Sequence, residues 1–324
     1  MTISFQSILD AETRIGPYKI ITPLLTSDRL NQKLPFDLFV KADCLQRTGS
    51  FKFRGACNAV FSLGVSNKPI LAYSSGNHAQ AVAAASKITG RQATIVMPED
   101  STKAKLDGTA FWGATIIKYN RNKENREEIG KRIAKELNAT IIPPFDDEKV
   151  IIGQGTAGIE CIEQLNKINV IPDIVLCCCG GGGLIAGIGT ALKAKFKNAK
   201  IFSVEPENFD DTKKSLAVNS IMSNDMNHTS ICDALLADKP GKITFEINRL
   251  NLTTGVAVSD KEALIAMNTA FRHLKIVLEP GGAVALAAAI FKKINIKNKN
   301  VLVIASGGNV DKDVFENCLN EQQI

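Results

Sequence analysis

Short apolar stretches alternate with longer segments of helical periodicity along most of the chain. The apolar stretches predict strands at 36–43, 69–75, 92–100, 114–120, 173–179, 200–207 and 300–308. Helices are predicted after Lys52 and at 77–90, 102–113, 123–138, 184–196 and 281–293. Because the strands are apolar without alternation, we expect both of their faces to be buried. The repetition of strand and helix therefore predicts an α/β fold, with parallel sheets covered on both faces by helices.

Four loops that follow predicted strands carry residues of unusual chemistry. They are TGSFKFRG at 48–55, SSGNHAQ at 74–80, CGGGGLIAG at 179–187 and SGGNVD at 306–311. Open α/β sheets bind their ligands at the carboxyl ends of their strands. We therefore expect these loops to meet at one site.

The first of these loops places Lys52 between two phenylalanines, where a helix is predicted to begin. Thr48 and Ser50 are candidate capping residues for that helix. A lysine near the positive end of a helix and beside apolar rings is easier to deprotonate, as an amine nucleophile requires. From these residues alone, the alternative is a lysine that extends past two core phenylalanines to solvent.

The third loop places four glycines, Gly180 to Gly183, between a strand and a helix that begins near Leu184. Consecutive backbone N–H groups at a helix N-terminus favour a bound phosphate. The spacing of Gly181, Gly183 and Ala186, with Glu205 at the end of the next strand, also satisfies the dinucleotide fingerprint. An NAD-binding oxidoreductase is therefore an alternative, although it leaves Lys52 and two of the loops without a role.

The charge and cysteine patterns exclude several classes of function. The chain has 324 residues and a net charge of +6, but its lysines are scattered among acidic and apolar residues, which argues against nucleic-acid binding. We find no signal peptide and no apolar run near the roughly 20 residues that span a bilayer. The eight cysteines fit neither a zinc site nor a disulfide framework. We expect buried thiols, a cytoplasmic protein, and neither a nucleic-acid nor a membrane partner.

Six motifs together resemble one family. TGSFKFRGA, SSGNHAQA, GQGT (153–156), GGGGL, EPG (279–281) and SGGNVD follow one another as in the serine racemase and serine/threonine dehydratase group of fold-type II pyridoxal-phosphate enzymes. The resemblance spans roughly residues 20 to 312. It implies two open, mostly parallel sheets with helices on both faces. It also implies a large cofactor-binding domain over 1–64 and 146–324, a small mobile domain over 65–145, and a homodimer.

The resemblance also implies roles for individual residues. Lys52 would hold the cofactor as a Schiff base and then act as the base at the substrate Cα, while Ser75 would exchange a proton on the opposite face. The residues implied to bind the cofactor are Phe51, Lys52, Asn77, Gly180, Gly181, Gly182, Gly183, Leu184 and Ser306. Those implied to bind the substrate are Ser74, Ser75, Asn77 and His78, although His78 equally fits a structural role. Arg126 either reaches a side-chain carboxylate or lies on a helix surface, and the surface interpretation is favoured.

A divalent-cation site is implied by the same resemblance. Glu205, Asp211 and the backbone carbonyl of Phe209 match it, and this donor set suits Mg²⁺ or Ca²⁺. The alternative is a solvated acidic loop. The segment SICDALLADKPG (230–241) departs from the family pattern and puts Ala234 in place of a glycine near the cofactor ring.

The implied activity is α,β-elimination from a small β-hydroxy amino acid, L-serine or L-threonine, to a 2-oxo acid and ammonia. Serine racemisation is expected as a further activity. The alternatives are an L-threo-3-hydroxyaspartate ammonia-lyase and a cofactor-binding sensor without activity.

Overall fold

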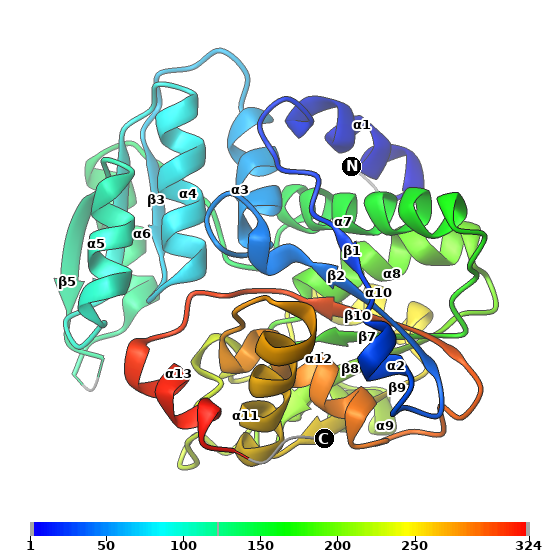
Figure 1. Ribbon diagram of the computed structural model, residues 1–324. Helices are drawn as coiled ribbons and strands as arrows, with labels where there is room; N and C mark the ends of the chain where they lie inside the picture. The colour runs from blue at the N-terminus through cyan, green and yellow to red at the C-terminus, as the bar shows by residue number, and fades with distance from the viewer. Residues whose placement is uncertain (1–2, 122, 322–324) are drawn as a thin grey trace.

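Two β-sheets organise the computed structural model, which describes residues 3–121 and 123–321 (Figure 1). The larger sheet has the strand order β1-β2-β10-β7-β8-β9, and the smaller has the order β5-β4-β3-β6. All strand pairs are parallel except β1 with β2. The predicted α/β class, with two mostly parallel sheets flanked by helices, is confirmed.

The strands lie between the helices along the chain, as the sequence pattern predicts. The strands are β1 (Leu24–Leu25), β2 (Asp37–Ala42), β3 (Ile70–Tyr73), β4 (Ala93–Pro98), β5 (Thr115–Tyr119), β6 (Thr140–Ile141), β7 (Ile174–Cys178), β8 (Lys200–Pro206), β9 (Thr254–Val258) and β10 (Asn300–Ala305). The first helices are α1 (Phe5–Ile15), α2 (Asp28–Asn31), η1 (Asp43–Leu45), α3 (Lys52–Phe61), α4 (Asn77–Ile88), α5 (Lys103–Phe111), α6 (Arg126–Glu136) and α7 (Glu148–Lys167). The later ones are α8 (Gly183–Lys195), α9 (Asp211–Val218), η2 (Asp233–Leu235), α10 (Lys242–Asn251), α11 (Asp260–Thr269), η3 (Ala270–Leu274), α12 (Pro280–Ile290) and α13 (Lys312–Leu319).

Both faces of each sheet are covered. In the larger sheet, α7 and α8 lie on one face and α11 and α12 on the other (Figure 1). In the smaller sheet, Ile70 and Ile95 pack toward α3 and α4, whereas the adjacent Leu71 and Val96 pack toward α6. Successive strand side chains point to opposite faces, so burial on both explains why these strands are apolar throughout.

Two further expectations concern the cysteines and the membrane. All eight cysteines are buried free thiols, as predicted. Among the described residues, no helix combines the length and the apolar character that crossing a membrane requires.

Candidate active site

The predicted loops meet in one cavity at the carboxyl ends of β3, β7 and β10. Every residue predicted to bind the cofactor or the substrate lines it. The loops come from both sheets, because Ser74 to His78 follow β3, whereas the glycines follow β7 and Ser306 follows β10. The expectation of a single site at the strand ends therefore agrees with the cavity.

The helix that carries Lys52 begins at that residue, but its predicted capping by Thr48 and Ser50 is wrong. Phe51 is the N-cap, and no side chain caps the helix. The two hydroxyls are buried and have no hydrogen-bond partner among the described residues. The segment instead pairs with the loop after β10, because the N–H of Phe51 donates to the Ser306 carbonyl at 2.9 Å. This pairing fixes Lys52 relative to the end of β10.

The amine of Lys52 is held inside the cavity. Its Nζ donates to the carbonyl oxygen of Pro144 at 2.7 Å and lies 5.2 Å from the centre of the Phe51 ring. Phe53 is turned into the core, so only one of the two predicted rings is beside the amine. Burial lowers the pKa of Lys52 to about 8, against the opposing effects of Cys178 and Glu279. The neutral fraction near neutral pH is therefore larger than for an ordinary lysine, which suits a nucleophile or a base.

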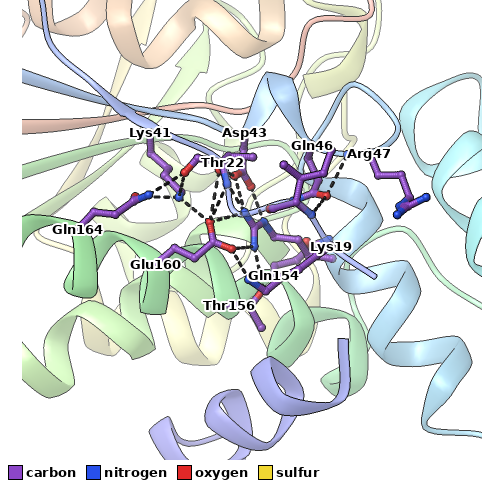
Figure 2. A network of polar contacts seen from close by, with 12 residues as sticks. Lys19, Thr22, Lys41, Asp43, Gln46, Arg47, Gln154, Thr156, Glu160 and Gln164 are labelled. Carbon is purple, nitrogen blue, oxygen red and sulfur yellow. Dashed lines mark hydrogen bonds and ion pairs between the residues drawn. The ribbon is translucent and has the colours of Figure 1, made fainter. Parts of the chain in front are cut away.

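A buried ion network anchors this helix, and its residues do not belong to the cavity lining (Figure 2). The guanidinium of Arg54 makes paired contacts of 2.7–2.9 Å with the carboxylates of Asp43 and Glu160. Glu160 also accepts from Lys41 at 2.6 Å. These contacts tie α3 to η1, β2 and α7, so they fix the position from which Lys52 enters the cavity.

The glycine loop forms a cradle at the start of α8. Gly182 has a φ of +91°, a left-handed conformation that favours glycine. A Cβ on Gly181 would lie 2.3 Å from the Phe145 ring, and one on Gly182 would lie 2.8 Å from Asn248 Nδ2. Side chains are therefore excluded next to the first N–H groups of α8, which have no partner within the helix. This arrangement fits a phosphate group.

Two side chains of the SSGNH loop form hydrogen bonds with other segments of the chain. Asn77 Nδ2 donates to Glu279 Oε1 at 2.6 Å, and its Oδ1 accepts from Asn309 at 2.7 Å. His78 Nε2 lies 2.9 Å from the Ile142 carbonyl, so that nitrogen carries the proton. Burial, and then the charge of Lys52, lower the pKa of His78 to about 3. His78 is thus neutral, and its bond to Ile142 supports the structural interpretation, although the residue also lines the cavity.

Three cavity residues were missed as site residues. Glu279 is the first residue of the EPG motif and lines the cavity. Burial, and then the charge of Asp233, raise its pKa to about 8. Lys105 in α5 forms an ion pair with Asp233 in η2, across the cavity mouth. The motif was the only sequence signal for Glu279, and the ion pair joins segments far apart in the chain.

Arg126 lies at the cavity wall although it is exposed. It is the first residue of α6, which Asn125 caps, and its guanidinium lies 5.9 Å from the centre of the Tyr73 ring. No carboxylate forms an ion pair with it in the part of the chain that the structure describes. The favoured surface interpretation is therefore incomplete, because one side chain is both exposed and part of the cavity.

Comparison with known proteins identifies the family. Residues 15–307 match the family described as pyridoxal-phosphate dependent enzyme. The chain belongs to this family. It is 41% identical to the L-threo-3-hydroxyaspartate ammonia-lyase of Saccharomyces cerevisiae, covering 99% of this chain and 97% of that protein. It is 37% identical to the serine racemase of Schizosaccharomyces pombe, covering 98% of each.

A solved structure supports the same assignment. The threonine deaminase of T.th. superimposes with a TM-score of 0.90 at 40% identity, covering 95% of this chain and 99% of that one. Within this pyridoxal-phosphate family, Lys52 and the glycine cradle fit the aldehyde and the phosphate of the cofactor. The alternative of an NAD-binding oxidoreductase is wrong. Both carboxylate oxygens of Glu205 accept N–H groups at the start of α9, from Thr212 at 2.8 Å and Lys213 at 2.9 Å, so this residue caps a helix.

The predicted metal residues lie beyond the cavity, at the end of β8. Asp211 Oδ1 accepts from Asn224 at 2.6 Å, while its buried Oδ2 has no partner among the described residues. Burial raises the pKa of Asp211 to about 7; burial and then the charge of Asp211 raise that of Glu205. Within the described ranges, no three acidic, cysteine or histidine side chains form a metal-binding group. The alternative of a solvated loop is wrong, because Glu205, Phe209 and Asp211 are buried.

Proposed function

We propose that this pyridoxal-phosphate enzyme is an ammonia-lyase that acts on a small β-hydroxy amino acid. The observation that carries the proposal is the buried amine of Lys52, which faces the same cavity as the glycine cradle. The products are a 2-oxo acid and ammonia: water leaves across Cα and Cβ, and the resulting enamine is hydrolysed. The three relatives named above act on amino acids of this kind, according to their names.

Different residues of this chain have different roles in the reaction. When bound, pyridoxal phosphate withdraws electrons from the substrate Cα and so acidifies its C–H bond. Lys52 would hold the cofactor through its amine and, with that amine free, would remove the Cα proton, for which a pKa near 8 is well matched. Phe51 would lie beside the ring, and Gly180 to Gly183 and Leu184 would hold the phosphate. Asn77 would bind the ring's 3′ oxygen, and Ser306 would bind its nitrogen.

The substrate that we favour carries a second carboxylate, as in L-threo-3-hydroxyaspartate. Arg126 supplies a guanidinium at the cavity wall with no carboxylate partner among the described residues, and Lys105 is already neutralised by Asp233. A guanidinium binds a carboxylate through two parallel hydrogen bonds. L-serine and L-threonine, which have no second carboxylate, would occupy the same cavity without this contact.

Serine racemisation is a second candidate activity. Ser75 lines the cavity, and its hydroxyl would serve the face of Cα opposite Lys52. Ser74 would bind the substrate carboxylate beside it. The serine racemase relative at 37% identity supports testing this activity.

A metal site, a mobile small domain and a homodimer also belong to the proposal. Glu205, Asp211 and the Phe209 carbonyl would bind Mg²⁺ or Ca²⁺, which the unpartnered Asp211 Oδ2 and the raised pKa values of both carboxyls support. Residues 65–145 would move as a small unit against the remainder.

A homodimer would cover an apolar surface formed by Tyr18, Ile20, Ile21 and Leu45, all of which are exposed. Gln46 joins these two segments, because its amide bonds to the backbone of Ile20 at 2.9 Å and 2.7 Å. An exposed cluster of this kind is typical of an interface.

The proposal is tested by 2-oxo acid release from the purified protein with Mg²⁺. L-threo-3-hydroxyaspartate, L-serine and L-threonine are offered separately. The protein should be yellow, and Lys52→Ala should remove both the lysine-bound cofactor absorbance and turnover. A variant that retains either would overturn the role of Lys52. A yellow wild-type protein that releases no 2-oxo acid from any of the three would support the sensor alternative.

A further inference from the structure

Three consecutive cysteines lie where β7 ends and the glycine cradle begins, two at the end of the strand and Cys179 just after it, and each has a different partner. Cys177 Sγ lies 3.5 Å from the carbonyl oxygen of Cys178, and Cys179 Sγ lies 3.3 Å from Thr212 Oγ1. Cys178 Sγ lies 3.1 Å from Ser306 Oγ. Of the three thiols, only that of Cys178 reaches the residue expected to bind the cofactor ring.

This contact forms where two neighbouring strands end. Strands β7 and β10 are parallel neighbours in which Ile304 lies opposite Cys177, so Cys178 at the end of β7 and Ser306 just after β10 lie at the same edge of the sheet. Cys178 and Ser306 both line the cavity, and both are buried. The thiol and the hydroxyl therefore meet at the floor of the cofactor site.

A serine hydroxyl has one proton to donate and two lone pairs that can accept. The geometry allows the Cys178 S–H to donate to Ser306 Oγ, which has no second hydrogen-bond partner among the described residues. The Ser306 proton is then free to point into the cavity. If Ser306 instead donated to the sulfur, its lone pairs would face the cavity and could bind only a protonated nitrogen.

We propose that Cys178 is a positioning residue, whose S–H donates to Ser306 and thereby directs the Ser306 proton toward the ring nitrogen of the cofactor. The inference rests on the proposed pyridoxal-phosphate chemistry and on the role of Ser306 in it. Cys178 thus selects the hydroxyl orientation that pairs with an unprotonated ring nitrogen. An unprotonated ring is a weaker electron sink, which suits prompt elimination.

The test measures the binding and the absorbance of the cofactor, and not turnover. Cys178→Val keeps an apolar side chain but removes the donor, and Cys178→Ser keeps a donor. Cys177→Ala is the matched control, because that neighbouring cysteine is buried on the same strand but does not line the cavity. The cofactor dissociation constant and the absorbance maximum of each holoenzyme are compared with those of the wild type.

We expect Cys178→Val to weaken cofactor binding about threefold, as loss of one modest hydrogen bond implies. Its absorbance maximum should also move. Cys178→Ser and Cys177→Ala should both stay within about twofold of the wild type, with the maximum unchanged. If Cys178→Val does not fold, Cys178→Ala supplies the same comparison.

Unchanged absorbance and binding in the donor-free variant would overturn the inference and leave the proposed function intact. Equal changes in Cys178→Ser and Cys178→Val would also overturn it, since the donor would then be irrelevant. A wild-type protein that does not bind pyridoxal phosphate would instead overturn the proposed function.

Discussion

Asn77 donates its side-chain N–H to Glu279 across the cavity, at 2.6 Å, and so joins the first residue of α4 to the N-cap of α12. Gly307 makes room for this contact, because a Cβ at that position would lie 2.1 Å from Glu279 Oε1. Burial, and then the charge of Asp233, raise the pKa of Glu279 to about 8. The carboxyl is therefore mostly protonated at neutral pH in the cofactor-free protein.

This raised pKa predicts a pH-dependent stability. In the unfolded chain Glu279 ionises near its ordinary value of 4.5, whereas the folded protein retains the proton to about pH 8. The free energy of unfolding should therefore fall as the pH rises from 4.5 to 8, by on the order of 3 kcal/mol. Glu279→Gln is neutral throughout and should lose this slope. Urea unfolding of the cofactor-free proteins at pH 5 and pH 8 checks the prediction, which fails if both slopes are equal.

The position of Arg126 at the cavity wall predicts that replacing it weakens the binding of one substrate more than that of another. Arg126→Met should raise the KM for L-threo-3-hydroxyaspartate about tenfold or more, because a charge-assisted hydrogen bond is lost. The KM for L-serine should change little. Steady-state kinetics with both substrates makes the comparison, and Arg132→Met is the control, since that arginine is exposed on the same helix and, among the described residues, forms an ion pair with Glu136 alone. An equal change in both KM values would mean that Arg126 has a general structural role and does not bind the second carboxylate.

The role proposed for Ser75 predicts that one substitution separates racemisation from elimination. Ser75→Ala should abolish serine racemisation, because the second face of Cα loses its hydroxyl, while elimination from the L-substrate persists. Chiral chromatography of the remaining serine and 2-oxo acid assays on the same sample distinguish the two reactions. The role assigned to Ser75 is wrong if the variant still racemises serine at the wild-type rate.

The fold and the cavity could be predicted from the sequence because their signals are local. Unalternating apolar strands indicate burial on both faces, and Gly180 to Gly183 together mark an anion-binding turn. The capping error at Ser50 and the missed role of Glu279 have another cause. Each depends on segments distant in the chain: the loop after β10 for Ser50, and Asn77, 202 residues away, for Glu279. Local propensity carries no information about such pairings.

The acidic pair at the end of β8 predicts stabilisation by a divalent cation. Adding Ca²⁺ or Mg²⁺ should raise the melting temperature of the wild type by a few degrees, because the cation binds only the folded chain. Asp211→Asn should abolish this increase, whereas Asp225→Asn, which changes an exposed carboxylate, should preserve it. Thermal unfolding with and without each ion checks this. An increase that survives in Asp211→Asn would place the cation elsewhere.

The buried ion network around Arg54 predicts a large loss of stability when this arginine is replaced. Arg54→Met would leave Asp43 and Glu160 buried without their bidentate partner, which costs about 3–5 kcal/mol. The exposed pair of Arg121 and Asp100 is the control, since Arg121→Met should cost less than about 1 kcal/mol. Denaturant unfolding measures both values, and similar losses in the two variants would contradict the prediction.

The same network determines how this stabilisation responds to acid. Burial raises the pKa of Glu160, but the charge of Arg54, followed by those of Lys41 and Lys19, outweighs it and holds the pKa at about 2. A folded pKa below the unfolded value of 4.5 means that this stabilisation is complete above pH 4.5 and is lost as the pH falls toward 2. In Arg54→Met the pKa of Glu160 rises, so the acid-dependent loss should be smaller. Unfolding free energies between pH 5 and pH 3 measure the difference, and an unchanged slope would show that Arg54 does not control Glu160.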